Sequence, residues 1–344
     1  MKRTLTWLLG LMMAFITSCE HKDLCYHHPH AVKIKVQFDW TNAPDANPEG
    51  MCVFFHPILE DGRDAEDLGS AVRFDFQGMK GGEVDLQVGR YRVICYNNDT
   101  EGVLFKGKEW FDTHQAYTRE GHIFESIYGN ASQYAPRAEG TEEERVVISP
   151  DMMWGSTAYD VEVTDEGLSY TCIPFKDKDE VRVEALEHII TLYPGELICT
   201  YTYEIRNVNN LKSVTQMCAS LSGMSGGLFF GNEELYKECV TLPVEANKGD
   251  ETTIVGRFLT FGHHPDNAQE HRMLLYVWLD NGDKVCYGQH SDKFNVTDQV
   301  HQAPDKRHVH LIIDGLDLPE VISNGSGYEL EVDDWYEVYG DIYL

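Results

Sequence analysis

Several features that define common protein classes are missing from this chain of 344 residues. Its nine cysteines form no CxxC pair, which excludes zinc-ribbon and thioredoxin-like motifs. Basic residues are scarce, because 28 Lys and Arg stand against 57 Asp and Glu and the formal net charge is −29. Such a charge repels phosphate backbones, so we expect no nucleic-acid partner. No βαβ alternation is present, which excludes the doubly wound α/β classes.

Long hydrophobic runs are also missing, with the exception of a short one at the amino end. From residue 5 to residue 16 the only polar side chain is Thr6, and two basic residues precede the run. The run is too short to span a bilayer but has the length of a signal-peptide core. It ends in the letters ITSC, the pattern of a bacterial lipoprotein signal. We predict that residues 1–18 are removed and that Cys19 carries the lipid anchor.

The other eight cysteines lie mostly in apolar runs. A reduced cysteine in such a run behaves as a small buried hydrophobe, which is the simpler interpretation here. An exported protein can also form disulfides, and eight thiols allow so many pairings that we predict none in particular. The eight are Cys25, Cys52, Cys95, Cys172, Cys199, Cys218, Cys239 and Cys286.

Composition and length divide the rest of the chain. Residues 19–30 have no hydrophobic period and are predicted to form a tether. The tether contains His27, His28 and His30, but histidines in a linker commonly serve only as polar residues, so we predict no metal there. The remaining length fits two domains. The polar, acidic stretch 136–145 has no apolar stripe, so we place the boundary beside it and expect domains at 31–149 and 150–344.

Alternation of apolar and polar residues predicts strands in both domains. The segment Val32–Trp40 alternates over nine residues, which indicates one buried and one exposed face. Asp280–Asp283 predicts a type I′ hairpin turn, and residues 232–238 are the best short helix candidate. We therefore predict an all-β protein with two β-sandwich domains in tandem. The other expected strands are 51–55, 72–76, 84–88, 91–96, 181–183, 197–205, 273–279, 285–287, 308–313 and 328–339.

One motif has the spacing of a hydrolase active site. Gly223–Gly227 fits the GxSxG nucleophile elbow, in which a strand, a sharp turn and a helix expose the serine. Here the apolar letters LFF follow the motif in place of a helix. A glycine-rich loop beside a sandwich explains the pattern, so we do not expect Ser225 to be catalytic, and we expect no enzyme.

Two further patterns resemble metal sites. Asn97–Gly102 matches the opening of an EF-hand loop, but the twelfth position, which needs a bidentate glutamate, is Lys108, and we therefore expect a turn. His308 and His310 lie two apart on one strand and either share a metal with a third ligand or line an exposed face. The exposed face is the simpler interpretation, so no metal and no cofactor is predicted.

Tryptophans offer the one alternative function. Trp40 and Trp278 fit the buried phase of their strands, whereas Trp110 and Trp154 are free to present an aromatic platform to a sugar ring. A glycan-binding surface lipoprotein of a polysaccharide-uptake system is therefore the alternative to the interpretation that follows.

Four phrases carry a resemblance to a known family. They are GEVDLQVGRYRVICYN at residues 82–97, ASLSGM at 219–224, FNVTD at 294–298 and VDDW at 332–335. With the lipoprotein signal, they make the chain similar to the fimbrillin-type lipoproteins of Bacteroides-group bacteria, near the anchor or accessory subunits of type V pili, in a subfamily of unassigned function. The resemblance implies two transthyretin-like sandwiches and a lipoprotein of the outer membrane at the cell surface.

The resemblance also implies how such a protein assembles. Polymerising subunits lose a first strand to a trypsin-like protease, and the next subunit fills the groove by β-strand complementation. In this chain the first strand is Val32–Trp40, and Arg73 or Arg90 is a cleavage candidate that an uncleaved anchor would not use. The end, residues 328–344, is either a donated strand or a strand of its own domain. The implied partners are other pilus subunits, and Cys19 provides the lipid contact.

Overall fold

The computed structural model describes residues 31–59, 70–124, 135–164, 168–175, 178–185, 188–320 and 336–337. The predicted signal peptide, Cys19 and the tether lie outside these residues. Strands make up most of the regular structure in the described part, and its α-helix, α3 (Thr297–His301), is short. The all-β class predicted from the sequence is confirmed. In the described ranges, no helix has the length and apolar character needed to cross a membrane.

The first sandwich consists of two sheets that share one core. One sheet has the strand order β12-β1-β4 and the other the order β13-β9-β5-β2-β3. Alternating residues of β1 and the continuous apolar run of β2 meet between them, for example Ile34 and Phe55. The strands are β1 (Ala31–Phe38), β2 (Gly50–Ile58), β3 (Val72–Gln77), β4 (Gly82–Gln87), β5 (Gly89–Asn97), β9 (Trp154–Val163), β12 (His188–Leu192) and β13 (Gly195–Glu196).

The second sandwich is built in the same way from a four-stranded and a six-stranded sheet. Their orders are β18-β19-β14-β22 and β23-β21-β20-β15-β17-β8. Every residue of β20 is buried, because one face meets the main core and the other packs against Ile123, Phe124, Ala135 and Ala138. The strands are β8 (Arg145–Val146), β14 (Cys199–Asn209), β15 (Val214–Ser225), β17 (Cys239–Glu245), β18 (Asn247–Lys248), β19 (Ile254–Thr260), β20 (Met273–Leu279), β21 (Lys284–Tyr287), β22 (His308–Asp317) and β23 (Tyr336–Glu337).

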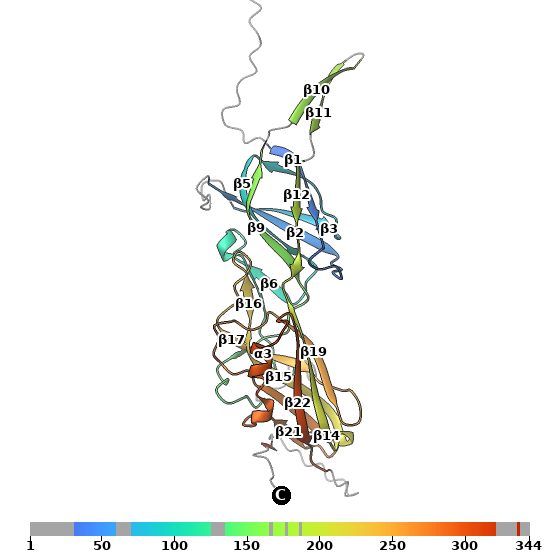
Figure 1. Ribbon diagram of the computed structural model, residues 1–344, viewed down its shortest axis with the longest axis vertical. Helices are drawn as coiled ribbons and strands as arrows, with labels where there is room; N and C mark the ends of the chain where they lie inside the picture. Colours follow the sequence, from blue (N-terminus) through green and yellow to red (C-terminus); the bar gives the residue numbers. More distant parts are fainter. Residues whose placement is uncertain are drawn as a thin grey trace, which may run out of the picture.

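A small sheet joins the two sandwiches, which lie end to end along the long axis (Figure 1). It contains β6 (Val103–Lys106), β7 (Gln115–Thr118) and β16 (Gly227–Phe229) in the order β16-β7-β6. A separate cluster of buried residues, including Tyr96 and Phe230, fills the junction. The two sandwiches therefore share a packed apolar interface.

The expected boundary at residues 149 and 150 is wrong. Strands β9, β12 and β13 follow that boundary in the sequence but pair within the first sandwich, whereas β8 precedes it and pairs with β17 of the second. The chain thus crosses between the sandwiches more than once. The polar stretch 136–145 has the composition of a linker, but it is ordered against the second sandwich. Arg137 donates to Thr241 Oγ1 of β17, and within the stretch it donates to Thr141 O and Glu144 O.

Most strand predictions are confirmed within the described residues, and two local predictions are wrong. The turn at Asp280–Asp283 does form a hairpin, but of its residues only Gly282 has positive φ, at 91°, whereas a type I′ turn needs two such residues. Residues 232–238 form no helix, while α3 was not predicted. The predicted strand 328–339 lies mostly outside the described residues, but β23 pairs in parallel with β21.

Another pair of strands stands apart from the two sandwiches. Strands β10 (Leu168–Phe175) and β11 (Lys178–Ala185) pair with each other in a two-stranded sheet. Figure 1 shows this hairpin beyond the end of the first sandwich where β1 begins.

Candidate functional site

Strand β1 lies in the middle of its sheet. It pairs in parallel with β12, from Ile34 opposite His188 to Phe38 opposite Leu192, and antiparallel with β4 along its other edge. Both rows of backbone groups therefore have partners, so this strand leaves no open edge. The sheet is complete as long as the chain keeps its first strand.

The inward face of β1 is part of the first core. Val32, Ile34, Val36 and Phe38 alternate along it and are between 0 and 8% exposed. Full burial of one such side chain is worth roughly 1.5–3 kcal/mol relative to exposure. The strand is thus held by side chains as well as by hydrogen bonds, and its loss would expose an apolar groove between β12 and β4.

The residues that follow β1 are fixed to the same sheet. The Asp39 N–H donates to Leu192 O at 2.8 Å, and the Trp40 indole N–H donates to Met79 O at 2.9 Å. Gly81 has a φ of 79°, and a Cβ there would lie 2.1 Å from Val36 O. Only glycine allows the turn before β4 to approach β1 so closely.

The two cleavage candidates lie inside later strands. Arg73 is in β3, the outer strand of the five-stranded sheet, and its guanidinium lies 2.7 Å from the Asp75 carboxylate. Arg90 is in β5, where it donates to both carboxylate oxygens of Asp160 at 3.0 and 2.7 Å. A cut at either arginine would separate β2 together with β1, because β2 precedes both in the chain.

The serine of the GxSxG motif is structural. Ser225 ends β15, is 2% exposed, and donates its hydroxyl to Gly227 O at 2.9 Å. The chain continues into β16 and no helix follows. The side chain is therefore not presented as it is on a nucleophile elbow.

The EF-hand-like segment is a turn, as expected. The Asp151 carboxylate accepts hydrogen bonds from the backbone N–H groups of Glu101 and Gly102 at 2.7 and 2.5 Å. Asn97 donates to Asp99 within the turn. The short polar side chains bind the backbone here, and the segment lacks flanking helices.

His308 and His310 lie on the exposed face of β22. His308 contacts Asp305 at 3.0 Å and Glu196 at 3.4 Å, while His310 lies 2.9 Å from Thr202 Oγ1. Their ring nitrogens have separate partners and do not converge.

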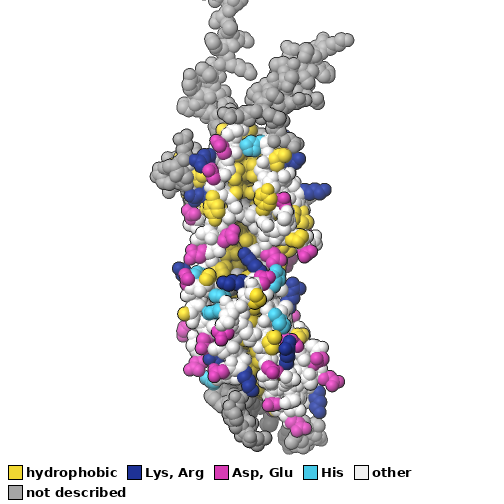
Figure 2. All heavy atoms as spheres, viewed as in Figure 1, with side chains coloured by type: hydrophobic (Ala, Val, Ile, Leu, Met, Phe, Trp, Pro, Cys, Tyr) yellow, Lys and Arg dark blue, Asp and Glu magenta, His cyan; other side chains and the backbone are white. Residues whose placement is uncertain are grey.

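Acidic side chains spread over the visible face of both sandwiches, interspersed with Lys and Arg (Figure 2).

Trp40 and Trp278 belong to the cores, as predicted, whereas Trp110 and Trp154 are half-buried in different surroundings. Trp278 is buried, and Trp40 packs against the first core. Trp110 is half-buried beside a short 3-10 helix, η2 (Phe111–Thr113). Trp154 is half-buried too, and it lines an open groove of about 720 Å³ at the junction, together with Arg257 and His308.

The described cysteines are free thiols. Cys52, Cys95, Cys199, Cys218 and Cys286 are buried, and Cys239 is half-buried. Burial raises the pKa of Cys52 to about 12 and that of Cys95 to about 11, so these thiols stay protonated and inert at neutral pH. Cys19, Cys25 and the side chain of Cys172 lie outside the described part.

Sequence reasoning missed two groups of histidines. His56 and His114 are buried at the junction, where desolvation lowers their pKa values to about 4 and about 3. His263, His271 and His301 meet in the second sandwich, although 38 residues of sequence separate the first from the last. Burial lowers the pKa of His271 to about 4 and also lowers that of His263. No periodic signal in the sequence connects the members of either group.

Comparison with known proteins gives likenesses over most of the chain. A family model described as "Domain of unknown function (DUF5119)" matches residues 18–245. A protein of Bacteroides ovatus named "Putative fimbrium anchoring subunit Fim4B" is 26% identical over 250 residues, which cover 72% of this chain and 61% of that protein. The match thus spans less than two thirds of the relative's length.

One solved structure shares the architecture, and a second is reported for comparison. The crystal structure of an adhesin from Bacteroides ovatus, described as putative, matches with a TM-score of 0.58 and 19% identity, and covers 85% of this chain and 94% of that one. The fimbrial anchor protein Mfa2 from Porphyromonas gingivalis matches with a TM-score of 0.44 and 13% identity, over 82% of this chain and 90% of that one. The first of these shows that the fold occurs in a protein of Bacteroides ovatus.

Proposed function

We propose, from the premise that the chain belongs to the family described as a domain of unknown function, DUF5119, that it is a lipid-anchored anchoring or accessory subunit of a fimbrium. The name of the Bacteroides ovatus relative supports this assignment. The single observation that carries it is the position of β1, which is sealed into its sheet and stands 12 residues after Cys19.

The chain connects the predicted lipid anchor to the folded body in a fixed order. The lipid at Cys19 reaches the folded body only through the tether and β1, so any cut that releases β1 also releases the lipid. Residues 39–49, which link β1 to β2, contain no Lys or Arg. A trypsin-like protease therefore has no site at which it could remove β1 and leave β2 in place. A chain that keeps β1 and an uncut tether keeps both its first sheet and its anchor, as the base of a fibre requires.

The geometry separates the two ends of such an anchor. The first strand begins at the end of the first sandwich farthest from the second, whereas β22 runs toward the opposite end (Figure 1). The lipid and the tether then belong to one end and the partner surface to the other. Strand β22 is an outer strand of its sheet, and a neighbouring subunit could add a strand beside it.

Mass spectrometry of the native protein tests the anchor. We expect a mature chain that begins at residue 19, bears acyl mass on Cys19 and includes residues 31–49 intact. The variant Cys19→Ser should leave the membrane fraction while the body stays folded. A native chain that starts after residue 38 would overturn the proposal.

The fimbrial partner needs a separate measurement. Cells that produce the wild-type protein should retain their fibres on the cell surface, and a Cys19→Ser strain should shed its fibres into the medium. A cross-linked ladder that contains the protein together with neighbouring subunits would identify the partners. Equal retention of fibres in both strains would contradict the anchoring role.

Glycan binding is the second candidate, and Trp154 is the observation that favours it. Its ring lines the open groove beside Arg257 and His308, where an aromatic face and polar groups could hold a sugar. Retardation in a polysaccharide gel that Trp154→Ala abolishes and Trp110→Ala preserves would support this function. Identical migration of the wild-type protein with and without polysaccharide would exclude it for the polysaccharides tested.

A further inference from the structure

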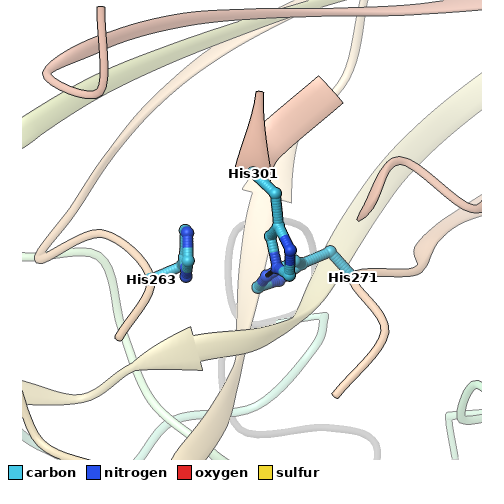
Figure 3. Close-up of side chains that lie close together, drawn as sticks. All are labelled: His263, His271 and His301. Carbon is cyan, nitrogen blue, oxygen red and sulfur yellow. Dashed lines mark hydrogen bonds between the residues drawn. The ribbon is translucent and has the colours of Figure 1, made fainter. Parts of the chain in front are cut away.

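Three histidines from two segments of the chain meet in the second sandwich (Figure 3). His263 lies in the loop after β19, His271 stands shortly before β20, and His301 is the last residue of α3. His271 is fully buried and the other two are half-buried. The fold thus brings two residues of the β19–β20 connection and the end of α3 together at one point.

Backbone carbonyls fix the orientation of two of these rings. His271 Nδ1 lies 3.1 Å from Ser222 O, and His263 Nδ1 lies 2.9 Å from His264 O. A carbonyl oxygen only accepts, so each Nδ1 carries the proton and each Nε2 keeps its lone pair. This is the arrangement found at metal-binding histidines, in which a carbonyl partner sets the tautomer of the ligand.

The ligand atoms are close enough to share an ion. One nitrogen from each ring lies within 4.8 Å of the others, and the two Nε2 atoms of His271 and His301 are 3.1 Å apart. Tetrahedral Zn²⁺ at about 2.0–2.1 Å from each nitrogen holds its ligand atoms about 3.3 Å apart. To close the site around such an ion, the spacing of the nitrogens must shrink from at most 4.8 Å to about 3.3 Å, which rotation of the side chains can supply.

We propose that His263, His271 and His301 bind one divalent transition-metal cation, Zn²⁺ in the first instance, through their imidazole nitrogens. Three neutral imidazoles without a thiolate or carboxylate suit Zn²⁺ and its borderline neighbours, and exclude Ca²⁺ and Mg²⁺ as the preferred ions. Three protein ligands leave one position of the tetrahedron for water.

The surroundings provide support and access. The His271 N–H donates to Thr297 Oγ1 at 2.8 Å, and its carbonyl accepts from the Val296 N–H at 2.9 Å. Gly223, with a φ of 79°, packs so closely that a Cβ there would lie 2.8 Å from His271 Nδ1. A cavity of about 440 Å³ at the junction has His263 and Val300 in its wall, which gives an ion a route from solvent.

The bound ion would act as a cross-link. His301 ends α3, which precedes β22, while His263 and His271 belong to the connection between β19 and β20. The metal would therefore link α3, which precedes β22 of the four-stranded sheet, to the connection that leads into β20 of the six-stranded sheet. It would stabilise the folded second sandwich by mass action.

The test is metal binding by the mature full-length protein in detergent. His27, His28 and His30 in the tether are replaced by alanine in every sample, because they are a competing source of imidazole. After chelator treatment, we expect one equivalent of Zn²⁺ to bind, a rise in melting temperature, and a visible absorption band with Co²⁺ as the probe. His301→Ala should lower the Zn²⁺ affinity at least about 100-fold, since it removes one of three ligands.

Two controls keep the test decisive. His308→Ala, an exposed histidine outside the cluster, should leave the affinity unchanged. His263→Gln provides a second, half-buried position in case His301→Ala fails to fold, and circular dichroism verifies the fold of each variant. If the folded parent takes up less than a molar equivalent of Zn²⁺, or if folded His263→Gln and His301→Ala both bind it as tightly as the parent, the proposal is wrong.

Discussion

Strands β1 and β22 have the same pattern of burial but opposite positions in their sheets. Each alternates buried and outward residues, and each pairs in parallel with a strand of its own sandwich, β1 with β12 and β22 with β14. A second neighbour, β4, covers the other edge of β1, whereas β22 is an outer strand. Within the part of the chain that the structure describes, β1 thus has a neighbouring strand on both sides and β22 has one on a single side.

This difference shows where each strand could contribute to assembly. A closed strand that also carries the lipid tether serves attachment, because its removal would cost the core four side chains and the anchor. An outer strand has backbone groups directed away from its sheet and offers a template for pairing. Alternation in the sequence indicates which face of a strand is buried, but the number of neighbours is a property of the topology.

The largest predicted effects concern the inward faces, where the two strands should behave alike. Ile34→Ala in β1 and Leu311→Ala in β22 each remove a fully buried side chain, so each should lower the free energy of unfolding by about 2–5 kcal/mol. Denaturant titration measures both. Lys33→Ala, at an exposed pair with Glu83, is the control and should change stability by less than about 1 kcal/mol. A cost below about 1 kcal/mol for Ile34→Ala would show that β1 is not part of the core.

The next largest effect is the pH dependence of stability that arises from buried histidines at the junction of the two sandwiches. Because burial lowers the pKa values of His56 and His114 in the folded state, the unfolded chain binds more protons below its ordinary histidine pKa of about 6.5. Stability should therefore fall as the pH drops from about 6.5 toward 4, by about 3 kcal/mol at pH 4 for His56 alone. In thermal melts, His56→Phe should flatten this acid limb, and an unchanged limb would contradict the assignment.

Much of the fold could be predicted because it depends on local pattern. Val32–Trp40 revealed its buried face through strict alternation, 308–313 was predicted as a strand, and the resemblance to fimbrillin-type proteins is confirmed by the comparisons. The domain boundary could not be predicted, because β9 and β12 return to the first sandwich by long-range pairing. His263, His271 and His301 were missed for the same reason, since tertiary packing alone brings them together.

A smaller effect is expected at the open edge of β22. The Gln299 side chain of α3 accepts a hydrogen bond from the Ile312 N–H at 2.7 Å and donates to Ile312 O at 2.8 Å, so it covers the outward backbone groups of that residue. Gln299→Ala should cost about 1 kcal/mol and should increase self-association, because the edge is then less protected. Analytical ultracentrifugation measures the association. Gln302→Ala on the same turn is the control, since that side chain bonds to Asp298 and not to β22. Equal sedimentation of both variants would argue against strand addition at this edge.

The smallest effect on membrane attachment is expected when the peptide chain is cut between β1 and β2. The cut tests whether strand pairing holds β1 on the body without the covalent link. In a background in which Lys22 of the tether is replaced by Ala in the variant and the parent alike, Asp45→Arg places an exposed trypsin site before Ala46 in the loop 39–49, which otherwise lacks one. Mass spectrometry should find this cut in the variant and not in the parent. The body should nevertheless sediment with membranes, because β12 and β4 hold the severed β1 on both edges and its inward residues remain in the core. Denaturant should then release the body of the cleaved variant and leave the parent attached. Release of the cleaved body under native conditions would show that β1 exchanges freely, and the closed strand would then differ little from the open one.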